Sequence, residues 1–430
     1  MTVMVQFSPR RASQRAAWLV RRRFQLLGAL IFAAGLPLLF RVFILPETML
    51  VTASWNAFFA NLAAVSIAYW LRLSFEPYPG IRSSYVILPT ATVAHGSVLA
   101  FFFFTRLPYD RLGFLLGFLI HILWFYLIYF LIQRRLRMRI AVVPMGNVAG
   151  LDAIDSVSWK PLPRPDTALL RDCDAVVADF SARLTPEWEG FLADAALAGS
   201  IVYQVKPLIE SLTGRVSIDH LSENSFGSLV PARGYFHFKT VLDWLVALVL
   251  LPGVIPVMLV AAAAIAIGDR GPILFRQTRI GHRGHPFGVW KFRTMRIGPE
   301  TQDARQAAIT GALDPRITRV GAFLRRSRID ELPQIFNILL GQMSWIGPRP
   351  EATVLSSWYV GELPFYRYRH VVKPGISGWA QVSQGHVADV SDVHQKLQYD
   401  FYYIKYFSPW LDLLIVFKTI KTMASGFGAK

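Results

Sequence analysis

The chain has 430 residues, of which 53% are hydrophobic and 17% are charged, and its mean hydropathy is +0.37. This length allows two or three domains, and the composition is too apolar for an ordinary soluble protein. The formal net charge of +17 indicates anionic partners, and with so many apolar residues it favours lipid headgroups or phosphorylated substrates over nucleic acid. A single cysteine, Cys173, excludes a disulfide framework and indicates a reducing compartment for the soluble part.

Four apolar stretches near the N-terminus are each about as long as a helix that crosses the hydrocarbon core of a bilayer. They lie at residues 24–45, 49–71, 85–105 and 112–132. Basic residues gather before the first stretch, after the second and after the fourth, whereas the loops at 46–48 and 106–111 hold fewer. By the positive-inside rule, both ends of the bundle face the cytoplasm. We expect a four-helix transmembrane bundle at residues 1–135, without a cleaved signal peptide.

Two polar residues lie inside these apolar stretches, where ionisable side chains are costly. We expect Arg41 to extend its guanidinium toward the membrane surface near a helix end. We expect His121 to pair with a neighbouring helix, and binding of a metal ion is the less favoured alternative.

Residues 136–232 are less hydrophobic and are typical of a small cytosolic α/β module. The apolar runs 140–143, 175–178 and 201–203 are typical of buried strands. Residues 186–199, between the last two runs, are typical of a helix, so the order strand, helix, strand predicts a parallel sheet. Because the G-x-G-x-x-G pattern does not follow the first strand, we expect a Rossmann-like module without a bound nucleotide.

A fifth apolar segment runs from Val241 to Ile267 and differs from the first four. As one straight helix it would be about 40 Å long, more than the ~30 Å hydrocarbon core of a bilayer. Pro252 and Pro256 remove helix hydrogen bonds in mid-segment and bend the axis. Both flanks are basic, which argues against crossing. We expect a re-entrant helix at 241–267 that enters one leaflet and returns, and a tilted fifth span is the alternative.

The remaining polar part of the chain is rich in arginine, glycine, proline and aromatic residues, and it completes a third domain at residues 233–430. We expect a membrane-associated α/β domain there. Two of its helices have apolar faces, at residues 332–340 and 402–407. These faces either lie on the membrane or form the core of the domain.

Asp330 and Glu331 stand at the head of one of these helices, in a strongly basic region. Between Arg270 and Asp330 there are 13 Lys or Arg residues and 4 Asp or Glu residues. The helix dipole and the nearby Arg325, Arg326 and Arg328 are expected to keep both carboxylates ionised. An ionised aspartate is a competent nucleophile toward phosphorus, and the pair can also hold a magnesium ion together with substrate phosphates. Helix capping with surface ion pairing is the alternative.

Six further polar residues are candidates for substrate binding: Lys291, Arg293, Arg349, Lys373, Gln381 and Asp400. Lys291 and Arg293 alternate, so an extended strand would direct both to the same side. The two prolines beside Arg349 stiffen its backbone and favour a bidentate contact with phosphate. The glycines between Lys373 and Gln381 allow a ligand to approach the backbone closely. Together these residues predict a phosphate-handling site.

Four motifs resemble, in the same order, those of the bacterial sugar transferases, which are polyprenyl-phosphate sugar-1-phosphate transferases, also called monotopic phosphoglycosyl transferases. They are KFRTM (291–295), DELPQIFNILLGQMSWIGPRPE (330–351), KPGISGWAQV (373–382) and LQYDFYYIKYF (397–407). The resemblance covers residues 235–430. The first 230 residues resemble more loosely the four-span bundle and Rossmann-like module of the larger members.

This resemblance implies a two-step, magnesium-dependent reaction at the cytoplasmic face of the bacterial inner membrane. The aspartate that matches Asp330 attacks the β-phosphate of a UDP-sugar, UMP leaves, and a covalent sugar-phosphoryl enzyme remains. Undecaprenyl phosphate, positioned by the re-entrant helix, then takes the sugar phosphate. Glu331 would support Asp330 as a metal ligand or as an acid/base partner. By the same resemblance, the phosphate-binding residues are Lys291, Arg293 and Arg349, and the residues that shape the site are Gln381 and Asp400.

This chain departs from the family pattern at the re-entrant helix and after Gln381, and the second departure leaves the transferred sugar open. Relatives commonly break the re-entrant helix at Ser-Pro, whereas this chain has Ile255 before Pro256. After Gln381 the run 382–386 replaces a Gly-Arg-Asn-like turn. We expect a hexose such as glucose or galactose, with an N-acetylated sugar as the alternative.

The larger family members begin exopolysaccharide, capsule or O-antigen synthesis, so other polysaccharide-assembly enzymes are expected partners. Pairing of two copies into a homodimer stays open. The rival function is that of a non-catalytic membrane scaffold for such an assembly, and the intact Asp330, Glu331 and Arg349 argue against it.

Overall fold

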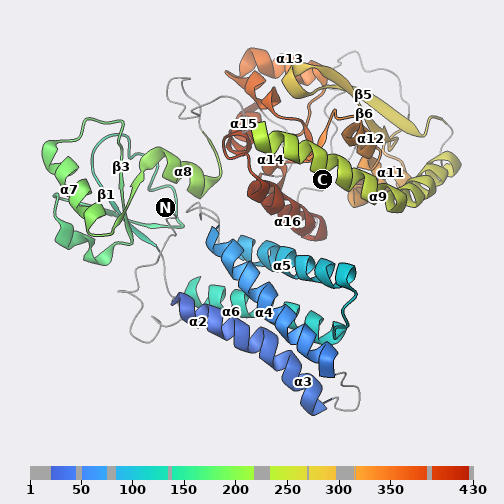
Figure 1. Cartoon of the computed structure of the whole chain (residues 1–430). Helices are drawn as coiled ribbons and strands as arrows, with labels where there is room; N and C mark the ends of the chain where they lie inside the picture. Colours follow the sequence, from blue (N-terminus) through green and yellow to red (C-terminus); the bar gives the residue numbers. More distant parts are fainter. Residues whose placement is uncertain are drawn as a thin grey trace. The chain divides into compact units, whose positions relative to one another are not determined.

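The computed structural model describes residues 21–44, 51–74, 84–133, 138–216, 233–268, 271–296, 314, 316–384 and 390–425. It divides into two compact units, Met1–Gly214 and Arg215–Lys430 (Figure 1). The first unit contains a helical bundle and a small α/β module. The second contains a long helix and an α/β domain, and it begins before the expected boundary at residue 233, because Val216 N donates to Gln398 O (3.0 Å).

The bundle consists of helices whose close contacts are made by small residues. Its elements are α2 (Arg22–Leu30), the π-helical turn η1 (Ile31–Gly35), α3 (Leu36–Ile44), α4 (Val51–Ser74), α5 (Ser84–Thr105) and α6 (Arg111–Gln133). Ala29, Ala33 and Ala64 are fully buried between helices, whereas Phe103 and Phe104 are exposed on the outside. Small residues at the contacts and large apolar residues outside are typical of helices that associate within a lipid bilayer.

Among the described residues, four helices are long and apolar enough to cross a membrane. They are Arg22–Phe43, Val86–Thr105, Arg111–Leu131 and Gly234–Gly268. Helix α4, which covers the second expected span, is long enough but is not among them. Its polar residues include Asn56, whose amide donates to Pro108 O (2.7 Å), and Asn61, whose amide donates to Gly113 O (3.1 Å). Three of the four expected N-terminal spans therefore qualify, and so does the fifth apolar segment.

His121 and Arg41 both have partners outside their own helices. The His121 ring lies 5.3 Å from the His95 ring of α5, which confirms the expected pairing between helices. Arg41 Nε lies 2.6 Å from Asp110 Oδ2, with 16% of the Arg41 side chain exposed. A carboxylate just before α6 thus balances the charge of Arg41, and the expectation that its guanidinium extends toward the membrane surface stays a prediction.

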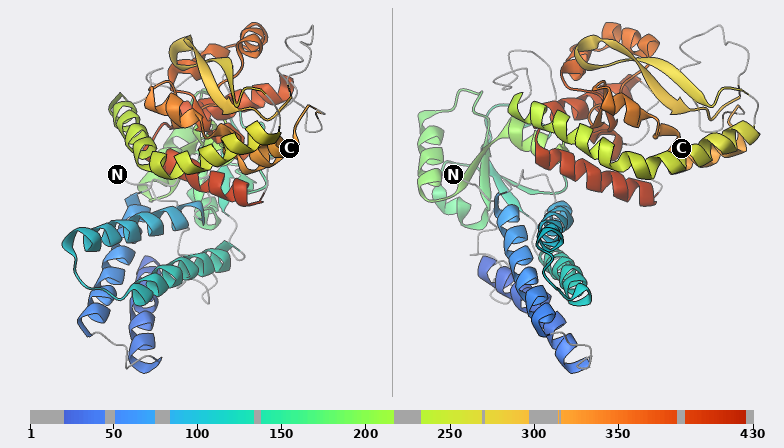
Figure 2. Two further views of the ribbon diagram at one scale, coloured as in Figure 1. Left: turned by 90° about the vertical axis from the view of Figure 1, so that its right-hand side faces the viewer. Right: turned by 45° about the vertical axis from the view of Figure 1, so that its right-hand side comes forward.

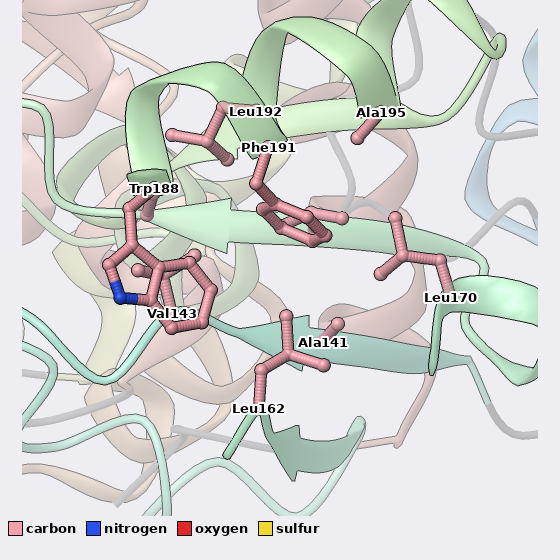
Figure 3. Packing of buried hydrophobic residues seen from close by; sticks show 10 residues of the cluster. Ala141, Val143, Leu162, Leu170, Trp188, Phe191, Leu192 and Ala195 are labelled. Carbon is pink, nitrogen blue, oxygen red and sulfur yellow. The ribbon is translucent and has the colours of Figure 1, made fainter. Parts of the chain in front are cut away.

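The α/β module has a four-stranded parallel sheet in the order β2-β1-β3-β4. Its strands are β1 (Arg139–Val142), β2 (Ser158–Pro161), β3 (Ala175–Ala178) and β4 (Ile201–Gln204), and its helices are η3 (Thr167–Asp172), α7 (Pro186–Leu197) and α8 (Val205–Thr213). Trp188, Phe191 and Leu192 of α7 pack over Ala141 and Val143, as Figure 3 shows. The expected strands and helix are confirmed, whereas the polar edge strand β2 carries no apolar signal and was not predicted.

The first described helix of the second unit is α9 (Arg233–Gly268), a continuous helix of 36 residues that includes Pro252 and Pro256. Its ribbon changes direction near the middle (Figure 2), as expected for prolines that remove helix hydrogen bonds. Ala247 of α9 packs against Ile335 and Ile338, and the later part of α9 packs beneath the residues that precede Asp330.

The rest of the second unit is built from short strands and helices. They are β5 (Leu274–Ile280), η5 (His282–Gly284), β6 (Pro286–Phe292), α11 (Arg319–Ser327), η6 (Ile329–Glu331), α12 (Gln334–Leu339), β7 (Ser344–Ile346), α13 (Thr353–Glu362), η7 (Tyr366–Val371), β8 (Gly375–Ser377), α14 (Trp379–Ser383), α15 (Val390–Lys405) and α16 (Pro409–Ser425). Strands β5 and β6 form an antiparallel hairpin, and β7 pairs with β8 in parallel. Helices α9 and α16 lie on the side of the unit away from the hairpin (Figures 1 and 2).

The apolar faces expected at 332–340 and 402–407 contribute mainly to the core. Ile335 and Ile338 are each 2% exposed, and Tyr402 and Tyr403 are each 1% exposed. The large side chains Phe336 and Leu340, by contrast, are exposed. The core interpretation therefore holds for most of both faces.

Candidate active site

A sharp turn between α11 and α12 presents Asp330 and Glu331. Helix α11 ends at Ser327 and is followed by Arg328, which has φ +59° and ψ +15°, a left-handed conformation that is uncommon for a residue with a side chain. The chain then forms the single turn η6, and α12 begins after Pro333. Asp330 and Glu331 are 8% and 6% exposed, so the turn buries two adjacent carboxylates.

Three cations converge on the Glu331 carboxylate. Its Oε1 lies 2.6 Å from Arg349 Nη2, 3.4 Å from Lys291 Nζ and 3.8 Å from Arg328 Nη1. Burial alone would raise the pKa of Glu331, but these cations, Arg349 first, hold it well below its ordinary value. Glu331 is therefore a fixed negative charge that gathers cations.

Asp330 has the opposite electrostatic environment. Burial and the neighbouring Glu331 charge raise the pKa of Asp330, and Lys291, Arg328 and Arg349 offset this only in part. The nearby arginines therefore do not lower the pKa of Asp330 as they lower that of Glu331, because the loss of water outweighs them. Its Oδ1 is buried without a hydrogen-bond partner among the described residues, so it is available to a ligand.

A further cation, Arg279, belongs to this cluster and was not predicted as a site residue. It lies on β5, and its pKa is lowered to about 10 by burial and by repulsion from Arg349. Burial also lowers the pKa of Lys291 to about 8, against the attraction of Glu331. With Arg328, four cations surround two carboxylates, which leaves a positive site suited to phosphate groups.

Three predicted residues contact other parts of the domain. Arg293 follows the end of β6, and its guanidinium packs against Gly271. Lys373 lies over the Phe236 ring, with its Nζ 5.8 Å from the ring centroid. Gln381 donates to Ile376 O (3.3 Å). Of the predicted cations, the structure thus brings Lys291 and Arg349 to Glu331.

Asp400 reaches the cluster through a residue that the sequence gave no reason to single out. Its Oδ2 lies 2.8 Å from Arg369 Nη2, and the same nitrogen donates to Arg349 O (2.8 Å). Burial raises the pKa of Asp400, although Arg369 and Lys396 lower it. Arg369 stands in a run of basic residues on η7, so no local pattern distinguishes it.

The acidic pair is compatible with a magnesium ion. Among the residues that the structure describes, no group of three or more His, Cys, Asp or Glu side chains could hold a metal. Magnesium, however, usually takes one or two carboxylates and completes its shell with water and substrate phosphates. Asp330 Oδ1 supplies a free, buried carboxylate oxygen for such a site.

The fold and this cluster together define a membrane protein with a buried pair of carboxylates surrounded by cations. The model of the bacterial sugar transferase family matches residues 234–426, which include all of these residues. The UDP-N-acetylgalactosamine-undecaprenyl-phosphate N-acetylgalactosaminephosphotransferase of Aeromonas hydrophila is 45% identical over 376 residues, 87% of each chain. The chain therefore belongs to the bacterial sugar transferase family, which confirms the resemblance of the four motifs.

Two other relatives align with less than half of this chain. The UDP-glucose:undecaprenyl-phosphate glucose-1-phosphate transferase of Klebsiella pneumoniae is 42% identical over 185 residues, 43% of this chain and 39% of the relative. The protein of the same name from Escherichia coli is 41% identical over 180 residues, 41% of this chain and 38% of the relative. The relatives thus include enzymes named for two different sugars.

Proposed function

We propose that this protein transfers a sugar-1-phosphate from a UDP-sugar to undecaprenyl phosphate. The names of its relatives support this reaction class. The observation that carries the proposal is the contrast within the acidic pair, in which Glu331 is bound by cations and Asp330 Oδ1 is free. A free carboxylate beside clustered cations is the arrangement that a nucleophile needs to approach an anionic phosphate.

In the first step, an Asp330 carboxylate oxygen attacks the β-phosphorus of the donor. A new bond forms between the aspartate oxygen and phosphorus, the bond from phosphorus to the bridging oxygen breaks, and UMP leaves with that electron pair. Arg349, Lys291 and Arg279 offset the negative charge that the donor brings. Magnesium bound at Asp330 and Glu331 would neutralise and orient the donor phosphates.

In the second step, a phosphate oxygen of undecaprenyl phosphate attacks the same phosphorus. The aspartyl–phosphorus bond breaks, Asp330 leaves as a carboxylate, and the product is the undecaprenyl diphosphate sugar. Two steps mean that two polyanionic substrates never occupy the cation cluster together. Because burial raises the pKa of Asp330, its carboxyl group must be in the deprotonated form before each attack on phosphorus.

We propose an N-acetylhexosamine as the first donor to test. The relative that aligns along 87% of the chain is named for N-acetylgalactosamine, whereas those named for glucose align along less than half. Glucose and galactose, expected from the sequence, remain the rival sugars. UMP release from a panel of UDP-sugars by purified protein separates these alternatives, and release from none of them would favour the non-catalytic scaffold.

We propose that α9 is re-entrant and that the site faces the cytoplasm at the inner membrane. The change of direction near the middle of α9, a helix that contains Pro252 and Pro256, supports this arrangement, and a UDP-sugar is a cytoplasmic substrate. Lys239 Nζ lies 2.6 Å from Asp412 Oδ2, which binds the start of α9 to α16 within the second unit. The undecaprenyl chain would then reach the site from the leaflet in which α9 lies.

We propose that the parallel-sheet module is Rossmann-like and binds no nucleotide. The loop after β1 contains Gly146, with φ +77°, at the edge where such modules bind phosphates. There the Asp179 carboxylate accepts from Asn147 N (2.8 Å) and from Ser181 N (2.9 Å). Because a carboxylate already holds these amides, a phosphate would have to displace it. A homodimer through this module and contacts with other assembly enzymes stay predictions.

A further inference from the structure

The segment that carries Arg349 is held through its main chain by a residue outside the cluster around Glu331. Arg369 Nη2 donates to Arg349 O at 2.8 Å, and only 3% of the Arg369 side chain is exposed. A buried guanidinium is costly unless its charge and its donors are satisfied. The contacts of Arg369 therefore indicate which parts of the domain its buried guanidinium holds together.

Carboxylates from two elements balance the Arg369 charge. Its Nη2 lies 2.8 Å from Asp400 Oδ2 and its Nη1 lies 4.0 Å from Glu351 Oε1. Its Nη1 also donates to the Tyr366 hydroxyl (2.7 Å), and Glu351 is paired in addition with Lys396. Burial alone would lower the pKa of Arg369, but these partners raise it above its ordinary value. The guanidinium is thus a permanently charged junction between η7, α15 and the segment after β7.

The two carbonyl groups after Arg349 O also have partners. Arg279 Nη1 donates to Pro350 O (2.5 Å), and Ile280 N donates to Glu351 O (3.2 Å). Three successive carbonyl groups are therefore held, next to two prolines that restrict the backbone further. The Arg349 side chain is therefore attached to a backbone segment that cannot shift without breaking several hydrogen bonds.

We propose that Arg369 is a positioning residue for the transfer reaction. By holding Arg349 O, it keeps the Arg349 guanidinium aligned with Glu331 and with the donor phosphates. Asp400 and Glu351 act one step further away, because they hold Arg369. This inference rests on the proposed function, since it concerns how the same site binds phosphate. Preorganised cations are effective because they need not rearrange when charge develops.

A double-mutant cycle tests this coupling in the full-length protein in detergent, with a UDP-sugar donor and undecaprenyl phosphate. Arg369→Lys keeps a positive charge but cannot hold Arg349 O, the Tyr366 hydroxyl and Asp400 together. We expect it to lower kcat/KM for UMP release by about 10-fold to 100-fold, as for a displaced binding group. In a protein that already carries Arg349→Lys, adding Arg369→Lys should lower kcat/KM for UMP release by less than about 3-fold. If the fold-loss of kcat/KM in the double variant equals the product of the two single losses, the residues act independently and the proposal is overturned.

Two controls separate positioning from general stability. Arg367 is exposed on the same η7 segment, so Arg367→Lys should leave kcat/KM unchanged. If Arg369→Lys does not accumulate as folded protein, Tyr366→Phe replaces it in the cycle, because it removes one partner of Arg369 and keeps every charge. An inactive wild type would count against the proposed function, whereas an active wild type with independent losses would overturn only the role of Arg369.

Discussion

At the residue scale, the adjacent carboxylates of Asp330 and Glu331 have different electrostatic environments and different proposed roles. Glu331 attracts Arg349, Lys291 and Arg328 and stays ionised, whereas Asp330 is buried beside that charge and its pKa rises. Neighbouring acids with pKa values moved apart are typical of sites in which one group is fixed and the other reacts. The sequence predicted the pair but not this difference, which depends on burial and on cations from β5, β6 and the segment after β7.

The pH dependence of UMP release should reveal Lys291. The Lys291 amine must be protonated to pair with Glu331 and to bind phosphate, and burial lowers the pKa of Lys291 to about 8. We therefore expect kcat/KM to fall as the pH rises through about 8. Lys291→Arg should extend activity to higher pH, because a guanidinium keeps its proton. Identical alkaline limbs for wild type and Lys291→Arg would contradict this role.

Removal of the Glu331 charge should destabilise the protein. Glu331→Gln leaves Arg349 and Lys291 close together without their counter-charge, and we expect a loss of about 2 kcal/mol, since both cations keep some exposure. Because the pKa of Glu331 is lower in the folded state, this stabilisation is present above pH about 4.3 and is lost as the pH falls. Thermal unfolding at pH 7 measures it, with Glu362→Gln on the surface of α13 as the control. An unchanged Tm would refute it.

At the element scale, local patterns predicted the long apolar helices, α7 and three strands of the small module, whereas most short elements of the second unit were not predicted. Long apolar runs predicted α9 and most helices of the bundle, and short apolar runs predicted β1, β3 and β4. The polar edge strand β2 gave no such signal. Arg279 and Arg369 lie 70 and 20 residues from Arg349 in the sequence, so only the fold brings them together. No spacing rule applies to such contacts.

The polar start of α9 provides a test at this scale. Asp412 of α16 pairs with Lys239 Nζ (2.6 Å) and accepts from the hydroxyls of Tyr235 (2.5 Å) and Tyr403 (2.8 Å). Asp412→Asn removes the charge opposite a buried lysine, and we expect a loss of about 3 kcal/mol. Thermal unfolding in detergent measures this loss. Asp392→Asn, at an exposed position on α15, is the matched control, and equal Tm values for both variants would contradict the role of Asp412.

At the scale of the whole molecule, the side of the membrane on which the site lies depends on whether α9 is re-entrant or spans the bilayer. A re-entrant α9 keeps the second unit on the side where the bundle ends, whereas a true span would put it on the other. A tag at Lys430, which lies outside the described residues, should be inaccessible to membrane-impermeant reagents added to intact cells with a permeabilised outer membrane. Labelling of that tag before lysis would make α9 a span and would remove the proposed cytoplasmic orientation.

The covalent intermediate is the claim on which the whole account depends. Intact-mass spectrometry of the purified protein, incubated with a UDP-sugar and magnesium but without undecaprenyl phosphate, tests it most directly. We predict a mass gain equal to one sugar-phosphoryl group, which maps to Asp330, is absent from Asp330→Asn and disappears when undecaprenyl phosphate is added. Full turnover to the lipid-linked product by Asp330→Asn, or by wild-type protein that never gains this mass, would contradict the account.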